Sequence, residues 1–323
     1  MIQTASQEKQ ERLLEKLRRE LGQSIMQALK DPLIIEIMLN PDGILWFDHL
    51  DKGMFSLGEI IDPLRAYNII CTVAYLRNKV VNDKNPCIEC ALPIDGSRFS
   101  GMIPEAVSQA CFNIRKRATH VFTLDNYIEK NIISTNQVES LRKVIHDKKS
   151  ILIVGGPGTG KTTFANALLH EMVLLGSPEQ RFVIIEETPE LQCSAKNKLV
   201  IKTTESLTFG RSLRHALVSR PDKICLGECR GAEVLTLLKA WNTGTQGGLS
   251  TLHANSAEAA LIRVAEMIEE NAGIRAQPNL ICEAIDVIVS MSFHKDTGRR
   301  VNDVLRITGF KEPHYQFESL GSL

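Results

Sequence analysis

A glycine-rich run that ends in lysine and threonine is the part of this sequence most able to do chemistry. Residues 155–162 read Gly-Gly-Pro-Gly-Thr-Gly-Lys-Thr and directly follow the apolar run 151–154. The apolar run predicts a buried strand and residues 163–172 predict a helix, so the glycine-rich run opens a helix whose first N–H groups lack partners. Such a loop binds phosphates, because glycine lets the backbone approach the phosphate oxygens and the N–H groups face them.

The side chains of this loop predict which ligand it holds. Lys161 can reach the β- and γ-phosphates of a nucleoside triphosphate, and the Thr162 hydroxyl can bind Mg²⁺. We therefore predict ATP and Mg²⁺ as the ligands. The loop residues expected to contact the nucleotide are Gly156, Pro157, Gly158, Thr159, Gly160, Lys161, Thr162 and Thr163.

Carboxylates follow two later apolar runs. Residues 182–185 are followed by Glu186 and Glu187, and residues 224–227 are followed by Glu228. At the carboxyl ends of parallel strands, one carboxylate can orient or deprotonate the attacking water, and another can hold Mg²⁺ directly or through water. Acidic residues also follow strands simply because loops are polar. We reject that explanation for Glu228 and leave it open for Glu187.

Basic side chains near the same predicted edge suggest contacts to the γ-phosphate. Arg211, Arg214 and His215 share one face of a helix predicted over 207–219. Arginines near a phosphate loop can stabilise charge on the γ-phosphate, sometimes from the next subunit. A lone histidine is more often structural than functional, but His253 follows another apolar strand, so we expect it to sense the γ-phosphate.

Two further groups of residues, earlier in the chain, allow a functional and a structural interpretation. Arg115 lies on the polar side of a strand predicted over 112–115, where its fork of donors could hold phosphate, and Arg98 precedes it; exposed arginines are also commonly a solvated surface. Cys87 and Cys90 have the spacing of half a zinc site or a redox pair. No second such pair exists in the sequence, so we expect these cysteines to serve packing.

Composition limits the classes of protein that this chain can belong to. Its 323 residues suggest about two domains. The 38 basic residues balance 38 acidic ones, so no overall field attracts nucleic acid or an anionic membrane, and we expect no stable direct binding to nucleic acid. No apolar run approaches the ~20 residues of a membrane span, and the start lacks the apolar core of a signal peptide. Together with eight scattered cysteines, this predicts a cytoplasmic chain.

The pattern along the chain predicts how these residues are positioned. Residues 1–30 form an amphipathic helical segment, 31–118 a small α+β domain with a hairpin and a helix, and 119–136 a linker. Residues 137–323 alternate strands and helices, which predicts an α/β domain with a mostly parallel sheet. The expected fold class is therefore α/β, a RecA-like P-loop core preceded by a smaller α+β domain.

The ordered set of motifs resembles the secretion-ATPase superfamily, which drives type II and type IV secretion and pilus assembly. The set comprises the phosphate loop, residues 182–191, residues 220–228 and the run Ser-Thr-Leu-His-Ala-Asn at 250–255. Within the superfamily, the chain most resembles TrbB-type ATPases of conjugative transfer, over roughly residues 30–310. This resemblance implies that Lys161 binds phosphate, Glu186 is the catalytic carboxylate, Glu228 is the Walker B acid and Mg²⁺ ligand, and His253 acts beside them. Whether Glu186 or Glu187 is the general base stays open.

The resemblance also implies how the protein works. Arg98 and Arg115 match basic positions by which the N-terminal domain closes over the nucleotide. The family implies a homohexameric ring in which ATP turnover moves the N-terminal domains, at the cytoplasmic face of the inner membrane and beside membrane components of a secretion or conjugation apparatus. Peripheral membrane association is compatible with it. Alternatives are a pilus-retraction or type II secretion-like ATPase, a DNA-stimulated RecA-like translocase, and a nucleotide-gated scaffold with negligible turnover.

Overall fold

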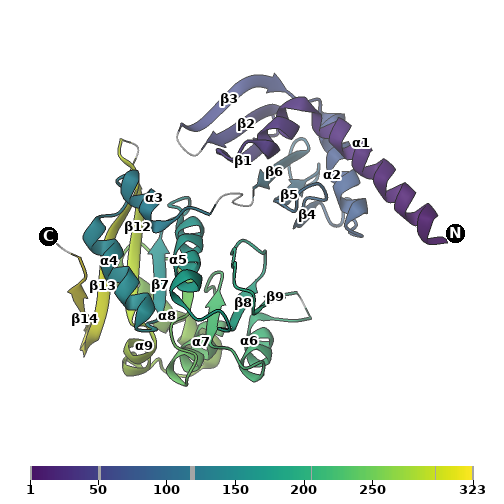
Figure 1. The fold of residues 1–323 in the computed structure, drawn as a ribbon. Helices are drawn as coiled ribbons and strands as arrows, with labels where there is room; N and C mark the ends of the chain where they lie inside the picture. Colours follow the sequence, from purple (N-terminus) through teal and green to yellow (C-terminus); the bar gives the residue numbers. More distant parts are fainter. Residues whose placement is uncertain (1, 50–51, 117–120, 205, 295, 322–323) are drawn as a thin grey trace. The chain divides into compact units, whose positions relative to one another are not determined.

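The protein is divided into two compact units, Met1–His120 and Val121–Leu323. The computed structural model describes residues 2–49, 52–116, 121–204, 206–294 and 296–321 (Figure 1). Each unit is built around its own core of buried apolar side chains. We therefore describe them one at a time.

The first unit is an antiparallel sheet packed against two helices. Its strands, in sheet order, are β3 (Gly53–Ile60), β2 (Ile44–His49), β1 (Ile34–Leu39), β6 (Cys111–Arg115), β5 (Arg98–Met102) and β4 (Cys87–Ala91). Helices α1 (Ile2–Lys30) and α2 (Pro63–Leu76) contact each other. The predicted hairpin is present, because Gly43 adopts the positive φ of 82° that the turn between β1 and β2 needs.

Local contacts explain how these helices begin and bend. The Asp62 carboxylate accepts the N–H groups of Leu64 and Arg65 and so caps α2. Helix α1 is interrupted at Gly22, where φ is 75°. The Arg65 side chain donates to the carbonyls of Glu20 and Leu21 at this break, so α2 supplies partners for groups of α1 near the interruption.

The second unit is an α/β fold around an eight-stranded sheet. In sheet order its strands are β14 (His314–Ser319), β13 (Gly298–Lys311), β12 (Val287–His294), β7 (Ile151–Gly155), β11 (Leu249–His253), β10 (Lys223–Leu226), β8 (Phe182–Glu186) and β9 (Lys198–Lys202). The pairs from β12 to β9 are parallel, and β12, β13 and β14 pair in an antiparallel way. The predicted fold class, an α/β core with a mostly parallel sheet after a smaller α+β unit, is confirmed.

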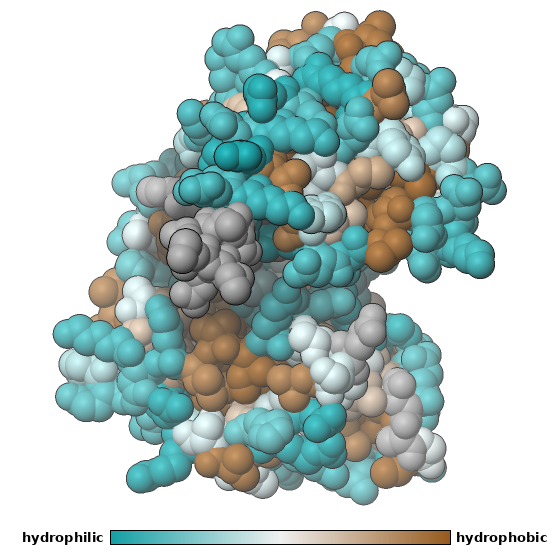
Figure 2. Space-filling model, turned by 90° about the vertical axis from the view of Figure 1, so that its right-hand side faces the viewer, coloured by the Kyte–Doolittle hydropathy of each residue, from teal (hydrophilic) through white to brown (hydrophobic). Residues whose placement is uncertain are grey.

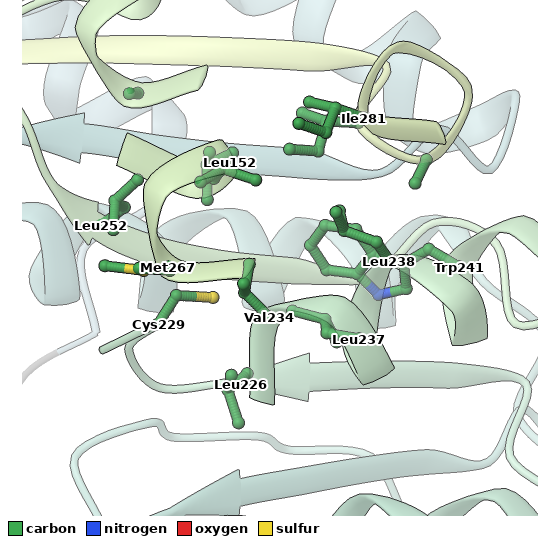
Figure 3. Close-up of a cluster of buried hydrophobic side chains, with 14 of the residues drawn as sticks. Leu152, Leu226, Cys229, Val234, Leu237, Leu238, Trp241, Leu252, Met267 and Ile281 are labelled. Atoms are coloured by element: carbon green, nitrogen blue, oxygen red, sulfur yellow. The ribbon is translucent and has the colours of Figure 1, made fainter. Parts of the chain in front are cut away.

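Helices cover both faces of this sheet (Figure 1). They are α3 (Leu124–Glu129), α4 (Thr135–His146), α5 (Lys161–Leu175), α6 (Phe209–Val218), α7 (Glu233–Asn242), α8 (Ala257–Ala272) and α9 (Pro278–Ala284). Figure 3 shows the core on one face, where Trp241 and Leu238 of α7 lie near Ile281 of α9. The Trp241 indole N–H donates to the Ile224 carbonyl at 3.1 Å, which satisfies its buried polar atom.

Residues 121–136, most of the predicted linker, pack within the second unit. Leu124 and Tyr127 of α3 are buried, and the Tyr127 ring meets Phe164 of α5 with centroids 5.1 Å apart. Apolar contacts of this kind hold the segment on the core, and the sequence shows them only once Phe164 is placed nearby.

Surface features of the described residues add two observations. The large exposed apolar residues include Met54, Leu57 and Ile60 on β3, the edge strand of the first sheet, and Figure 2 shows apolar patches separated by hydrophilic side chains. Among the helices that the structure describes, none combines the length and apolarity needed to cross a bilayer.

One ion-pair cluster joins three helices of the second unit. The Arg142 guanidinium of α4 contacts Glu171 of α5 at 2.8 Å and Asp125 of α3 at 3.0 Å. The Glu171 side chain is only 8% exposed, so removing its partner leaves a carboxylate with little water to solvate it.

We expect Arg142→Ala to lower the free energy of unfolding of the second unit by about 1–3 kcal/mol, because Glu171 loses a charged partner while nearly buried. The chain has two tryptophans, so urea unfolding of a Trp46→Phe background can follow Trp241 alone. The control is Arg306→Ala, whose pair with Glu318 is about half exposed on both sides and is worth roughly 0–1 kcal/mol. Equal losses in both variants would contradict the role given to Glu171.

Candidate functional site

The phosphate loop joins β7 to α5 in a conformation that requires glycine. Gly158 and Gly160 have φ values of 70° and 90°, which side chains disfavour. A Cβ on Gly155 would lie 2.5 Å from the Met291 carbonyl oxygen. Gly160 precedes the first helical residue and offers no capping side chain, so the first N–H groups of α5 face the loop. This is the anion-binding geometry that the sequence predicts.

Lys161 links the phosphate loop to the neighbouring strand. Its side chain is buried, and Nζ donates to the carbonyls of Gly155 and Gly156 at 2.9 Å each. The same Nζ lies 3.3 Å from Nδ1 of His253 on β11. The register explains this contact, because His253 pairs with Gly155 across β11 and β7. The structure thus brings together the predicted phosphate ligand and the predicted sensor.

Glu228 completes a line of contacts that starts at the loop. Its Oε1 lies 2.9 Å from Nε2 of His253, and its side chain is 20% exposed. Both imidazole nitrogens of His253 are therefore engaged, since Nδ1 faces Lys161. A neutral ring with Nε2–H donating to Glu228 and Nδ1 accepting from Lys161 fits this arrangement.

Arg230, which was not among the residues predicted from the sequence, extends the line of contacts to a third strand. Its guanidinium contacts Glu228 Oε2 at 2.6 Å and Glu187 Oε2 at 2.8 Å, so it bridges the acids that follow β10 and β8. Burial alone would lower the pKa of Arg230, but hydrogen bonding to Glu228 and the charges of Glu228 and Glu187 raise it overall. Its position two residues after Glu228 is the one signal that the sequence offers.

The two acids at the end of β8, Glu186 within the strand and Glu187 just after it, have different surroundings. Glu186 is 3% exposed, and its Oε1 accepts the N–H groups of Glu190 and Leu191 at 2.9 and 2.8 Å. Glu187 is 54% exposed and pairs with Arg230. Glu186 therefore stabilises the turn after β8, whereas Glu187 belongs to the line of contacts that runs from Lys161 to Arg230.

Shallow clefts border these side chains. One, of about 370 Å³, is lined by Glu228, Cys229, Arg230, Leu252, His253, Arg263 and Met267. A second, of about 400 Å³, is lined by Gly156, Pro157, His253, Ala254, Asn255, Ala259, Ile262, Arg263 and Glu266. His253 and Arg263 line both clefts, so open surface extends from the phosphate loop to Glu228, which follows β10.

The other predicted site residues of the second unit are more exposed. Thr162 and Thr163 are half-buried at the start of α5. Arg211 and Arg214 lie exposed on α6, where Arg211 donates to the Ser206 carbonyl at 2.5 Å. Their roles toward a nucleotide stay predictions.

In the first unit, Arg98 and Arg115 are direct neighbours. The register of β5 and β6 places them opposite each other, and Arg115 also faces Glu36 on β1. Arg98 pairs with Glu89 at 3.1 Å. Like charges directly opposite destabilise a sheet unless negative charge lies nearby, and Glu89 and Glu36 supply it here, so a role of the two arginines toward phosphate stays a prediction.

The two cysteines of β4 differ in burial, because Cys87 is exposed and Cys90 is half-buried, so the packing role predicted for this pair is wrong for Cys87. Cys87 and Cys90 are separated by three positions on β4, so strand alternation points them to opposite faces. Burial raises the pKa of Cys225 and of Cys229 to about 12 each, so both thiols are protonated at neutral pH. In the part of the chain that the structure describes, no group of three or more His, Cys, Asp or Glu side chains could hold a metal ion.

The surroundings of Glu36 indicate that the stability of the first unit depends on pH. Burial raises its pKa above the ordinary 4.5, Arg115 partly offsets this, and Asp48 adds to it. Because the pKa of Glu36 is raised in the folded state, its protonated form stabilises the first unit fully below about pH 4.5. This stabilisation is lost as the pH rises through the folded-state pKa of Glu36. We therefore expect Glu36→Gln to be more stable than wild type at pH 7, with the difference vanishing below pH 4.5.

Denaturant unfolding followed through Trp46 of β2, at several pH values, measures this difference. The exposed Glu11 of α1, changed to Gln, is the control and should show no such trend. A Glu36→Gln protein less stable than wild type at pH 7 would mean that attraction to Arg115 outweighs burial.

Comparisons with known proteins show which family the chain belongs to. Residues 81–301 match the family described as "Type II/IV secretion system protein". The chain is 40% identical over 307 residues to the "Conjugal transfer protein TrbB" of Rhizobium radiobacter, covering 95% of this chain and 94% of that protein. It is 28% identical over 321 residues to the "Type IV secretion system protein PtlH" of Bordetella pertussis, covering 87% and 92% of the two chains.

A solved structure supports the fold. The Legionella pneumophila ATPase DotB matches with a TM-score of 0.57 at 18% identity, over 89% of this chain and 80% of that one. At this identity the similarity concerns the fold alone. The sequence matches carry the assignment further: the chain belongs to the type II/IV secretion system protein family, among the TrbB conjugal transfer proteins.

Proposed function

We propose that this protein hydrolyses ATP to ADP and phosphate and uses the turnover to drive a conjugative or type IV secretion system. The observation that carries the proposal is the continuous line of contacts from Lys161 through His253 and Glu228 to Arg230 and Glu187. It joins the phosphate loop to the two acidic strand ends. The conjugal transfer and type IV secretion names of the relatives support the role.

Each side chain has a role in this proposal. Lys161 binds the β- and γ-phosphates, and His253 responds to the γ-phosphate through its contacts to Lys161 and Glu228. The hydroxyl and carboxylate oxygens of Thr162 and Glu228 suit Mg²⁺, which when bound neutralises charge on the phosphates. Arg211 and Arg214 stay candidates for the γ-phosphate of the same or a neighbouring subunit.

The general base is one of the two acids at the end of β8. Glu186 is proposed from the family resemblance, and its fixed position at the strand end suits a group that orients water. Glu187 is the alternative, because it is more exposed and already lies in the charged line.

Arg98 and Arg115 are proposed to bind phosphate from the first unit. Their cross-strand pairing concentrates two guanidinium groups in one place, which favours an anion. We propose further that the protein assembles as a homohexamer in which turnover moves the N-terminal units, beside membrane components at the cytoplasmic face of the inner membrane.

Steady-state ATP turnover across protein concentration, with particle size from light scattering, tests this function. We expect turnover to rise with a ring-sized species, to be lost in Lys161→Ala, and to fall by about 10²–10⁴ in Glu228→Gln. Glu258→Gln is the matched control, because Glu258 also contacts a histidine, His314, at 2.8 Å but on the surface. No turnover in any wild-type species would overturn the motor, and strong stimulation by single-stranded DNA would favour a translocase.

Arg230→Gln should change how much Mg²⁺ the protein requires. Arg230 neutralises Glu228 and Glu187, so its loss leaves more negative charge for a divalent cation to bind. We expect the Mg²⁺ concentration that half-saturates fluorescent ADP binding to fall severalfold. Arg263→Gln is the control, since Arg263 lines the same cleft but pairs with Glu266 on its own helix. An unchanged or higher Mg²⁺ requirement in Arg230→Gln would contradict this role.

A further inference from the structure

The order of strands determines in which direction a nucleotide leaves the phosphate loop. Strand β7 lies between β11 on one side and β12 on the other. His253 is the last residue of β11 and Glu228 follows β10, so the groups proposed for the γ-phosphate are on the β11 side. With that end of the nucleotide directed toward β11, the nucleoside end extends toward β12 and β13.

An aromatic ring and a guanidinium lie at that location. Met291 of β12 pairs with Gly155, so Phe293 stands two residues beyond the level at which the loop begins. Phe293 and Arg299 are direct cross-strand partners of β12 and β13. The Arg299 guanidinium lies 5.5 Å from the centroid of the Phe293 ring, within cation–π range.

The same arginine is attached to the phosphate loop. Its Nε donates to the Gly158 carbonyl at 3.1 Å, and its Cδ lies 3.1 Å from where a Cβ of Gly160 would be. The pair is therefore held against the loop rather than placed freely on the surface. Phe293 nevertheless remains 50% exposed as a residue.

From these positions we propose that Phe293 and Arg299 form the surface on which the base of the bound nucleotide stacks. The inference rests on the proposed ATP binding and adds the residues that contact the nucleoside. An aromatic ring and a guanidinium both stack on the π-face of a base. Since every base has such a face, the surface binds purine nucleotides without strong preference between adenine and guanine.

Titration calorimetry with ATP, GTP and inorganic tripolyphosphate, each with Mg²⁺, separates base contacts from phosphate contacts. Wild type should bind ATP and GTP within a few-fold of each other and tripolyphosphate more weakly. Phe293→Ala should weaken ATP and GTP by about tenfold and leave tripolyphosphate within twofold. Phe293→Trp retains an aromatic face and should restore the affinity for both nucleotides.

His294→Ala is the matched control, because strand alternation places this exposed neighbour on the opposite face of β12. It should leave all three affinities unchanged. Unchanged ATP affinity in Phe293→Ala would show that the base does not stack on Phe293. Equal weakening of all three ligands would also contradict the proposal, because it would mean that Phe293 only supports the conformation of the phosphate loop.

The proposed function fails in a different way. If neither ATP nor tripolyphosphate binds wild type, or if Lys161→Ala binds them as well as wild type does, the phosphate loop is not the nucleotide site. The proposed stacking of the base on Phe293 and Arg299 would then be wrong as well. Loss of all binding in Lys161→Ala, together with weaker binding of ATP and GTP but not of tripolyphosphate in Phe293→Ala, supports both the proposed ATP binding and the stacking surface.

Discussion

The parallel register of the central sheet is the constraint on which the site depends. His253 is level with Gly155 across β11 and β7, and the end of β10 lies next to that of β8. Groups far apart in the chain therefore meet at one edge, where the helix after β7 begins. A shift of one residue in β11 would point His253 to the opposite face and break its contacts to Lys161 and Glu228 together.

Charge balance along this edge follows from that placement. Lys161 and Arg230 supply two positive groups, Glu228 and Glu187 two negative ones, and His253 connects Lys161 to Glu228. Each contact contributes its full stabilisation to such a network only while every partner is present. The approach of a triphosphate and a divalent cation adds charges of both signs, so these contacts must rearrange together, which offers a physical route from binding to motion.

The sequence predicted the parts of the site that depend on neighbouring residues. The loop, the strand before it and the helix after it are contiguous, and acids after apolar runs are visible in the same way. Arg230 was missed because its second partner, Glu187, is 43 positions away and is found only through the pairing of β8 with β10. The environment of Glu186, and the packing of Tyr127 within a predicted linker, likewise depend on contacts that no local pattern contains.

The contact between Glu228 and His253 requires the two residues to act as one unit if the protein turns over ATP. A double-mutant cycle on kcat, with Glu228→Gln, His253→Ala and both together, measures this directly. We expect kcat of the double variant to fall about as much as that of the more damaged single variant, because each change already breaks the shared contact. If the two losses in kcat multiply instead, Glu228 and His253 act independently and do not form one unit.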